Sequence, residues 1–187
     1  MCACIHTGLI CSVIVFTYMH LAGGVPKPLC YTEAMNKYIN AQIRAFLEEE
    51  DMIAALANIS ACINENYDRL NWAGFYLVKN GELVLGPFQG KTACTHIPFD
   101  KGVCGKCYRD KASQRIDDVE AFPGHIACDS ASRSELCVPV IVNGECIAEI
   151  DLDSPFKNRF TADEQKEMEE AAADIAAAFI AKGWKLD

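Results

Sequence analysis

The chain has 187 residues, of which 51% are hydrophobic, and its formal net charge at pH 7 is -9. A chain of this length fits one domain and buries about 70% of the surface that the unfolded chain exposes, so folding needs no metal or disulfide. Nucleic acid is not expected as a partner, because phosphate binding uses clusters of Lys and Arg that this acidic chain lacks.

Eleven residues are cysteine, an odd number that cannot all be paired. A secreted disulfide framework favours a shorter chain that is poorer in large aliphatic residues. The composition therefore predicts a reducing, cytoplasmic compartment with several free thiols, some of which serve as small core residues.

The N-terminal segment differs from the rest of the chain. Residues 1–24 contain no Lys, Arg, Asp or Glu, and residues 9–22 are mostly apolar. A signal peptide would begin with basic residues, and a spanning helix needs about 20 apolar residues. Three interpretations stay open: a targeting or membrane segment that would place the protein in an organelle or on a membrane, a non-native upstream extension, or a packed helix.

Two helices are predicted to open the folded domain. Apolar residues recur at helical spacing at Met35, Ile39, Ile43 and Phe46 or Leu47, and after Asp51 at Met52, Leu56, Ile59 and Ile63. Each helix therefore has one apolar face.

A β-hairpin follows these helices. Residues 71–78 and 82–88 have strand character and are joined by the Asn-Gly pair at 80–81, which is typical of two-residue hairpin turns. A turn of this kind pairs Lys79 with Glu82.

The two faces of the first strand differ in character. Strand alternation places Trp72, Gly74 and Tyr76 on one face and Phe75 and Leu77 on the other. One face is therefore expected to be apolar core, and the other carries two amphipathic aromatic side chains.

The middle of the chain is less regular. A short helix is predicted over residues 101–111 and a strand over residues 114–119, and residues 120–133 form a long connection. Long ordered loops are often functional, so this connection is a candidate part of a site.

The second hairpin joins residues 134–142 to residues 145–153. A two-residue loop alone would place Leu136 opposite Asp151 and mix apolar with charged side chains. A three-residue loop or a bulge instead places Leu136 opposite Leu152. We predict the second register, because it separates the core from the carboxylates.

The last element is a helix capped by Thr161 and Glu164, which form a capping box, and ended by Gly183. Together the elements predict one α+β domain, with a central antiparallel sheet flanked by helices.

Three carboxylates gather on one sheet face in the predicted register. Glu135 lies opposite Asp153, and Asp151 points to the same side. Like charges so close cannot all ionise cheaply, so at least one should hold its proton near neutral pH. The functional hypothesis is a site for a cationic group with a general acid, and the alternative is a solvated acidic face.

The cysteines fall into two groups. Those at loop or element boundaries beside small residues should be accessible: Cys94, Cys104 and Cys128. Those within helices or apolar strands should be inert packing: Cys62, Cys137 and Cys146. His125 lies three residues before Cys128. It could lower the pKa of the Cys128 thiol, or it could be a structural histidine.

Cys104 and Cys107 form a C-x-x-C motif, which alone could be a redox pair or half a zinc site. The second half of a zinc site would have to come from irregular spacings, from Cys94, Cys128, His96 or His125. We therefore expect no metal.

Six stretches of the chain resemble the motifs of a known family, and they follow one another in the matching order. They are NWAGFYL, LGPFQGKTAC, KGVCG, FPGHIACDSAS, SELCVP and EIDLDS. The family is that of the free methionine-(R)-sulfoxide reductases, which are single-domain GAF enzymes, and several motifs are long enough for chance to be implausible. The resemblance covers about residues 31–181. It divides the chain into an apolar extension over residues 1–30 and a GAF domain over residues 31–187.

The resemblance implies reduction of free L-methionine (R)-S-oxide through a sulfenic acid and an intramolecular disulfide, which a thioredoxin-type dithiol then reduces. It makes Cys128 the attacking thiol, Cys94 the resolving thiol and Cys104 a third cysteine of less certain role. The substrate would be held by Trp72, Tyr76, Glu135, Asp151 and Asp153. No cofactor is expected, and a homodimer is left open. Because GAF domains in general bind small molecules or signal, a ligand or redox sensor without turnover is the alternative.

Three residues depart from the family pattern. Glu149 stands where the family usually has an aliphatic residue, and Cys107 and Cys137 are not family cysteines. None of them replaces a motif residue, but either cysteine could divert a sulfenic acid into an off-path disulfide.

Overall fold

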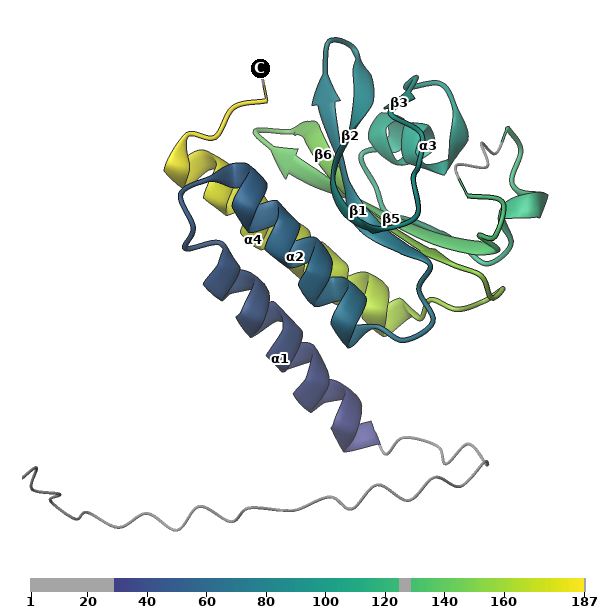
Figure 1. The fold of residues 1–187 in the computed structure, drawn as a ribbon, viewed down its shortest axis with the longest axis horizontal. Coiled ribbons are helices and arrows are strands. Elements are labelled where there is room, and N and C mark those ends of the chain that lie inside the picture. Colours follow the sequence, from purple (N-terminus) through teal and green to yellow (C-terminus); the bar gives the residue numbers. More distant parts are fainter. Residues whose placement is uncertain (1–28, 125–128, 187) are drawn as a thin grey trace, which may run out of the picture.

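The computed structural model describes residues 29–124 and 129–186, which form one antiparallel sheet with helices on both faces (Figure 1). The helices are α1 (Leu29–Phe46), α2 (Met52–Asn66), α3 (Gly102–Asp110) and α4 (Ala162–Lys182). The strands are β1 (Trp72–Lys79), β2 (Glu82–Gly90), β3 (His96–Ile97), β4 (Gln114–Ile116), β5 (Ser134–Val142) and β6 (Glu145–Ser154). Their order across the sheet is β3-β2-β1-β6-β5-β4, which confirms the predicted α+β architecture.

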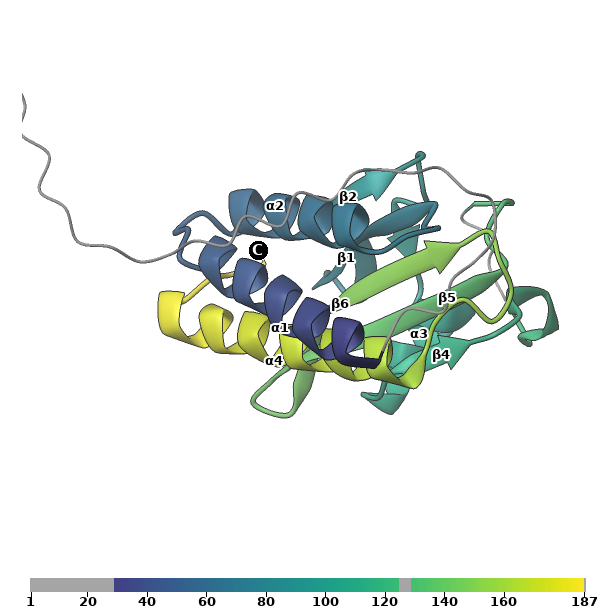
Figure 2. The ribbon, with the colours of Figure 1, turned by 90° about the horizontal axis from the view of Figure 1, so that it is seen from below.

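One face of the sheet is covered by α2 and α4, and α1 packs against both of these helices (Figure 2). The core between them is apolar and includes Ile59 from α2, Phe75 from β1, Ile150 from β6 and Ile175 from α4, all fully buried. The opposite face is covered by the short helix α3, which contacts β5, β4 and β6. A second, smaller core lies beneath α3.

The predicted helix boundaries are confirmed by their caps. Asp51 accepts a hydrogen bond from the backbone N–H of Ala54 at the start of α2. Thr161 and Glu164 form the capping box of α4, and Gly183 ends that helix in the left-handed region. Local chemistry therefore sets where both long helices of the sheet face begin.

Both hairpins have the predicted registers. Lys79 lies opposite Glu82 across the β1–β2 turn. In the β5–β6 hairpin Leu136 lies opposite Leu152 and Glu135 lies opposite Asp153, because a bulge follows Val140. The turn itself has two residues, so the bulge provides the shift that separates core from carboxylates.

One strand is shorter than predicted. β4 ends at Ile116, and a 3-10 turn follows at Val119–Ala121, capped by the carboxylate of Asp118. Asp118 favours a cap over an extended strand because its side chain bonds the local backbone. Residues 125–128 of the following connection, and nearly all of the apolar extension, lie outside the described residues. In the part of the chain that is described, no helix is long and apolar enough to cross a membrane.

Candidate active site

The sheet face beneath α3 collects the polar and aromatic side chains of three neighbouring strands. Three rows of backbone neighbours cross β1, β6 and β5, and rows are spaced about 7 Å apart along the strands. The rows consist of Trp72, Asp153 and Glu135, then of Gly74, Asp151 and Cys137, and then of Tyr76, Glu149 and Pro139. The alternation predicted for β1 therefore extends across the sheet.

An aromatic wall borders this face. The Trp72 ring stacks on Phe88 at 5.3 Å and on Tyr76 at 5.8 Å between centroids. Gly74 permits this packing, since a Cβ added there would lie 2.4 Å from the Cβ of Phe88. The indole N–H of Trp72 is buried and has no hydrogen-bond partner among the described residues. A polar group of a ligand could therefore accept from it.

The carboxylates of this face are buried without counter-charges. Glu135, Glu149 and Asp151 are each at most 5% exposed, and Asp153 is partly buried. Within residues 38–124 and 129–186, no lysine, arginine or histidine forms an ion pair with any of them. Buried charges are normally paired, so this face favours a positively charged ligand.

Burial changes the acidity of these groups. Loss of hydration raises the pKa of Glu135 well above its usual range, and the neighbouring Asp151 and Asp153 raise it further. The pKa of Asp151 is raised in the same way by burial, by Asp153 and by Glu149. Burial raises the pKa of Asp153 to about 7 and that of Glu149 to about 8. The cluster can therefore hold protons near neutral pH, and burial contributes more to this than the crowding of like charges does.

Two thiols lie among these carboxylates. Cys104 Sγ donates to Glu135 Oε1 at 3.6 Å, and Cys137 Sγ donates to Glu149 Oε2 at 3.3 Å. A hydrogen bond with Cys137 lowers the pKa of the Cys104 thiol, but burial and the carboxylates of Asp151, Glu135 and Glu149 outweigh it, so that pKa is raised. Cys104 therefore stays protonated here and can serve as a hydrogen-bond donor.

The structure corrects the expectation that Cys104 is accessible. It lies in the first turn of α3 with only 5% of its surface exposed, because that turn faces the sheet. Cys94 is partly exposed in the loop between β2 and β3, as predicted, and its carbonyl accepts a hydrogen bond from the hydroxyl of Tyr76 at 3.0 Å. The loop that carries Cys94 is thus joined to the aromatic wall.

Cys128 and His125 lie outside the described residues. The next residue in the chain, Asp129, accepts hydrogen bonds from Asn71 Nδ2 and from the backbone N–H of Ala131, both at 2.9 Å. The backbone N–H of Asn71 in turn donates to the carbonyl of Asp153 at 3.0 Å. Asp129 is thereby held at the Asp153 end of the carboxylate cluster.

Most of the predicted site residues are brought together. Five of the predicted residues share the face beneath α3, namely Trp72, Tyr76, Glu135, Asp151 and Asp153, and Cys104 reaches it from α3. Cys107, Cys137 and Glu149 are fully buried on the same side, although the sequence did not place them in the site. Strand alternation could have found the latter two, because Cys137 follows Glu135 by two positions and Glu149 precedes Asp151 by two.

Comparison with known proteins agrees with this geometry. A family model described as a GAF domain matches residues 59–179. The chain is 41% identical over 151 residues to the free methionine-R-sulfoxide reductase of Escherichia coli, covering 81% of this chain and 90% of that protein. It is 49% identical over 140 residues to the protein YtsP of Bacillus subtilis, covering 73% and 86%.

A solved structure of a free methionine-R-sulfoxide reductase has a similar fold. The free methionine-R-sulfoxide reductase of Neisseria meningitidis, in complex with its substrate, superposes with a TM-score of 0.79 at 38% identity, covering 88% of this chain and 98% of that one. The fold and the matched family model define a GAF domain. The chain belongs to the free methionine-R-sulfoxide reductase family of GAF-domain proteins.

Proposed function

We propose that this protein reduces free methionine (R)-sulfoxide to methionine with its own thiols. The observation that carries the proposal is a buried carboxylate cluster without ion pairs in the described chain, bordered by stacked aromatic rings and by Cys104. Membership of a family that includes named reductases supports the same chemistry.

The charge of the cluster accounts for a free amino acid as the substrate. Glu135, Asp151 and Asp153 would bind its α-ammonium group, which a methionine within a peptide lacks. Trp72 and Tyr76 would pack against the thioether methyl and sulfur. A ligand without the ammonium group would leave buried carboxylates unpaired and lose a few kcal/mol of binding free energy, about a hundredfold in affinity.

In the reaction that we propose, the thiolate of Cys128 attacks the sulfoxide sulfur while a carboxylic acid of the cluster protonates the oxygen. The hydroxyl group then passes from the substrate sulfur to Cys128 Sγ, so the substrate S–O bond and the new S–S bond both break and a Cys S–O bond forms. Methionine leaves with the electron pair on its sulfur, and Cys128 is oxidised to a sulfenic acid. A second thiol then displaces this oxygen as water and forms a disulfide. Two thiols are oxidised for each sulfoxide reduced.

Exposure supports the division of roles between the other two cysteines. Cys94 is partly exposed in a loop, so it can move to Cys128 and leave a disulfide that an external dithiol can reach. Cys104 is buried and donates to Glu135, so we assign it to holding that carboxyl group and the bound substrate. A thioredoxin-type protein would complete the cycle.

The catalytic cycle that we propose needs a compartment in which thiols stay reduced. The many free thiols among the described residues favour the reducing cytoplasm, where a dithiol protein is available. We keep residues 1–30 as an extension outside the reductase domain, and a homodimer remains compatible with the cycle.

One assay tests the activity. The reduced protein is incubated with separate R and S isomers of free methionine sulfoxide and dithiothreitol, and methionine is measured by chromatography. We expect turnover of the R isomer and little of the S isomer. N-acetylmethionine (R)-sulfoxide is the matched control, and turnover of it at a comparable rate would overturn ammonium recognition. Binding of the R isomer without any methionine formed would instead identify a sensor.

A further inference from the structure

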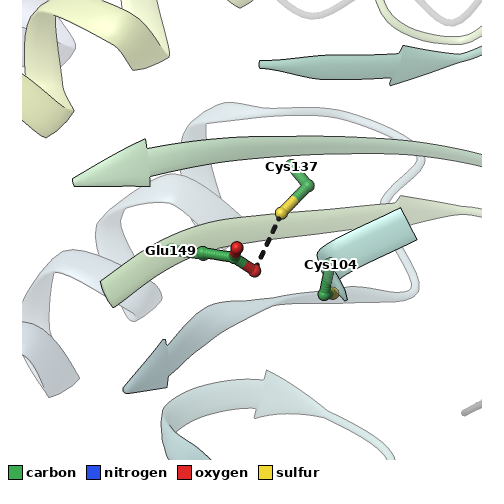
Figure 3. A group of neighbouring side chains, drawn as sticks. All are labelled: Cys104, Cys137 and Glu149. Carbon is green, nitrogen blue, oxygen red and sulfur yellow. Dashed lines mark hydrogen bonds between the residues drawn. The ribbon is translucent and has the colours of Figure 1, made fainter. Parts of the chain in front are cut away.

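Four side chains with metal-ligand chemistry meet beside the carboxylate cluster. Cys104 and Cys107 lie three residues apart on α3, a spacing that puts both thiols on one face of the helix. Cys137 comes from β5 and Glu149 from β6, and Figure 3 shows Cys137 and Glu149 directed toward each other with Cys104 beside them. Two further potential metal ligands, from strands β5 and β6, therefore lie beside the C-x-x-C motif of α3.

The distances suit a single ion. The sulfur atoms of Cys104 and Cys137 and a carboxylate oxygen of Glu149 all lie within 4.8 Å of one another. A tetrahedral zinc ion with bonds of about 2.0–2.3 Å holds its ligand atoms roughly 3.5–3.8 Å apart. The observed spacing is therefore close to the spacing that one zinc ion requires.

The burial of Glu149 provides a second, independent indication. Its side chain is fully buried, and its Oε1 atom has no hydrogen-bond partner in the described part of the chain. The other oxygen accepts a hydrogen bond from the thiol of Cys137, which is a weak donor. A buried carboxylate normally has a cation or several strong donors, and its neighbours here are thiols that can ionise and bind a metal.

We propose that Cys104, Cys137 and Glu149, with Cys107 as the adjacent fourth donor, form a binding site for a thiophilic divalent cation such as zinc. Thiolate sulfur and carboxylate oxygen are both zinc ligands, and a mixed set rich in sulfur favours zinc over magnesium or calcium. Binding releases the thiol protons to solvent. A second group, formed by Cys104, Glu135 and Asp151, is equally compact but has one sulfur, and we assign it to the substrate.

Because Cys104 belongs to both groups, the two ligands compete. An ion held by Cys104 withdraws its thiol from Glu135, so zinc should inhibit turnover reversibly and protect the thiols of the site from oxidation. This consequence rests on the proposed reductase function, whereas the metal site itself does not.

Cobalt provides a direct probe of the site. The full chain, reduced and freed of metal with a chelator, is titrated with Co²⁺ under nitrogen. We expect sulfur-to-cobalt charge-transfer absorption and the intense visible bands of tetrahedral cobalt, both lost on addition of Zn²⁺. The Cys137→Val and Glu149→Val variants replace a donor with a buried apolar side chain that has no ligand atom. Each should weaken cobalt binding by at least about tenfold.

Cys62→Ser is the matched control, because Cys62 is a buried free thiol on α2 within the other core. It should leave the cobalt spectrum and affinity unchanged. Where Cys137→Val unfolds, as judged by circular dichroism, Cys107→Ala and Glu149→Gln replace it. Absence of thiolate bands, or equal affinity in the wild type and the folded variants, would overturn the metal site.

The activity assay separates this proposal from the proposed function. We expect Zn²⁺ to inhibit methionine formation by the wild type and to do so at least about tenfold less potently in Cys137→Val. Cobalt binding by a protein without turnover would sustain the metal site and refute the reductase. Turnover without thiolate-bound cobalt would support the reductase activity and refute the metal site.

Discussion

The two faces of the sheet bury side chains of different chemistry. Beneath α2 and α4 most of the buried residues are apolar, as at Phe75 and Ile150. Beneath α3 the buried residues include carboxylates and thiols that no cation pairs within the described residues. Burial of apolar side chains on the first face offsets the cost of the unpaired carboxylates on the second, which we propose to bind the ammonium group of the substrate.

The largest effect that would test this comparison is expected at the proposed nucleophile. The Cys128→Ser substitution should lower kcat/KM for methionine (R)-sulfoxide by at least about a thousandfold, because the hydroxyl group is a far weaker nucleophile than a thiolate. Methionine release measured by chromatography checks this. Cys62→Ser should retain full activity, and a Cys128→Ser variant that still turns over would remove Cys128 from the mechanism.

Adjacent residues on β6 offer a sharper test, since Ile150 faces the apolar core and Asp151 faces the acidic cluster. Ile150→Ala should lower the free energy of unfolding by about 2–5 kcal/mol, because it leaves a cavity in a fully buried position. Its kcat/KM should stay near the wild-type value. Urea denaturation and the methionine assay measure the two effects.

Asp151→Asn should show the converse pattern. Losing a charged partner of the ammonium group should raise KM about tenfold or more. Stability should be unchanged or higher, because an unpaired buried carboxylate is removed. If Asp151→Asn unfolded the protein as readily as Ile150→Ala, the two faces would not differ in purpose.

The last prediction concerns the dependence of stability on pH. The pKa of Glu149 is raised from 4.5 to about 8, so the folded state binds this proton more tightly than the unfolded state does. Its contribution to stability is present in full below about pH 4.5 and is lost as the pH rises through about 8, with a slope of up to about 1.4 kcal/mol per pH unit. Glu149→Gln should therefore flatten the fall in unfolding free energy between about pH 5 and pH 8, measured with urea and a chelator. Parallel pH profiles for the two proteins would contradict a protonated Glu149.

The sequence predicted the framework because local chemistry specifies it. Asn-Gly turns and alternating side chains predict both hairpins, and the requirement to separate Leu136 from Asp151 predicts a three-residue loop or a bulge. Thr161 and Glu164 mark the start of α4 for a similarly local reason. These features depend on residues that are near in sequence or paired across one turn.

The parts that were missed depend on where α3 lies over the sheet. No local pattern shows that its first turn faces inward, so Cys104 was expected to be accessible. Cys137 is flanked by Leu136 and Val138, and its predicted burial in the core is confirmed, but no local pattern shows that its thiol donates to Glu149. Such placements arise from tertiary packing, which overrides the character of sequence neighbours.

Gly74 carries a consequence for how this protein can change over generations. A Cβ atom at this position would lie 2.4 Å from the Cβ of Phe88 and 2.7 Å from the Trp72 ring. Every amino acid other than glycine brings at least that one carbon, so no single codon change at this position offers a mild variant. Lineages that keep the stacked aromatic rings must therefore also keep this glycine.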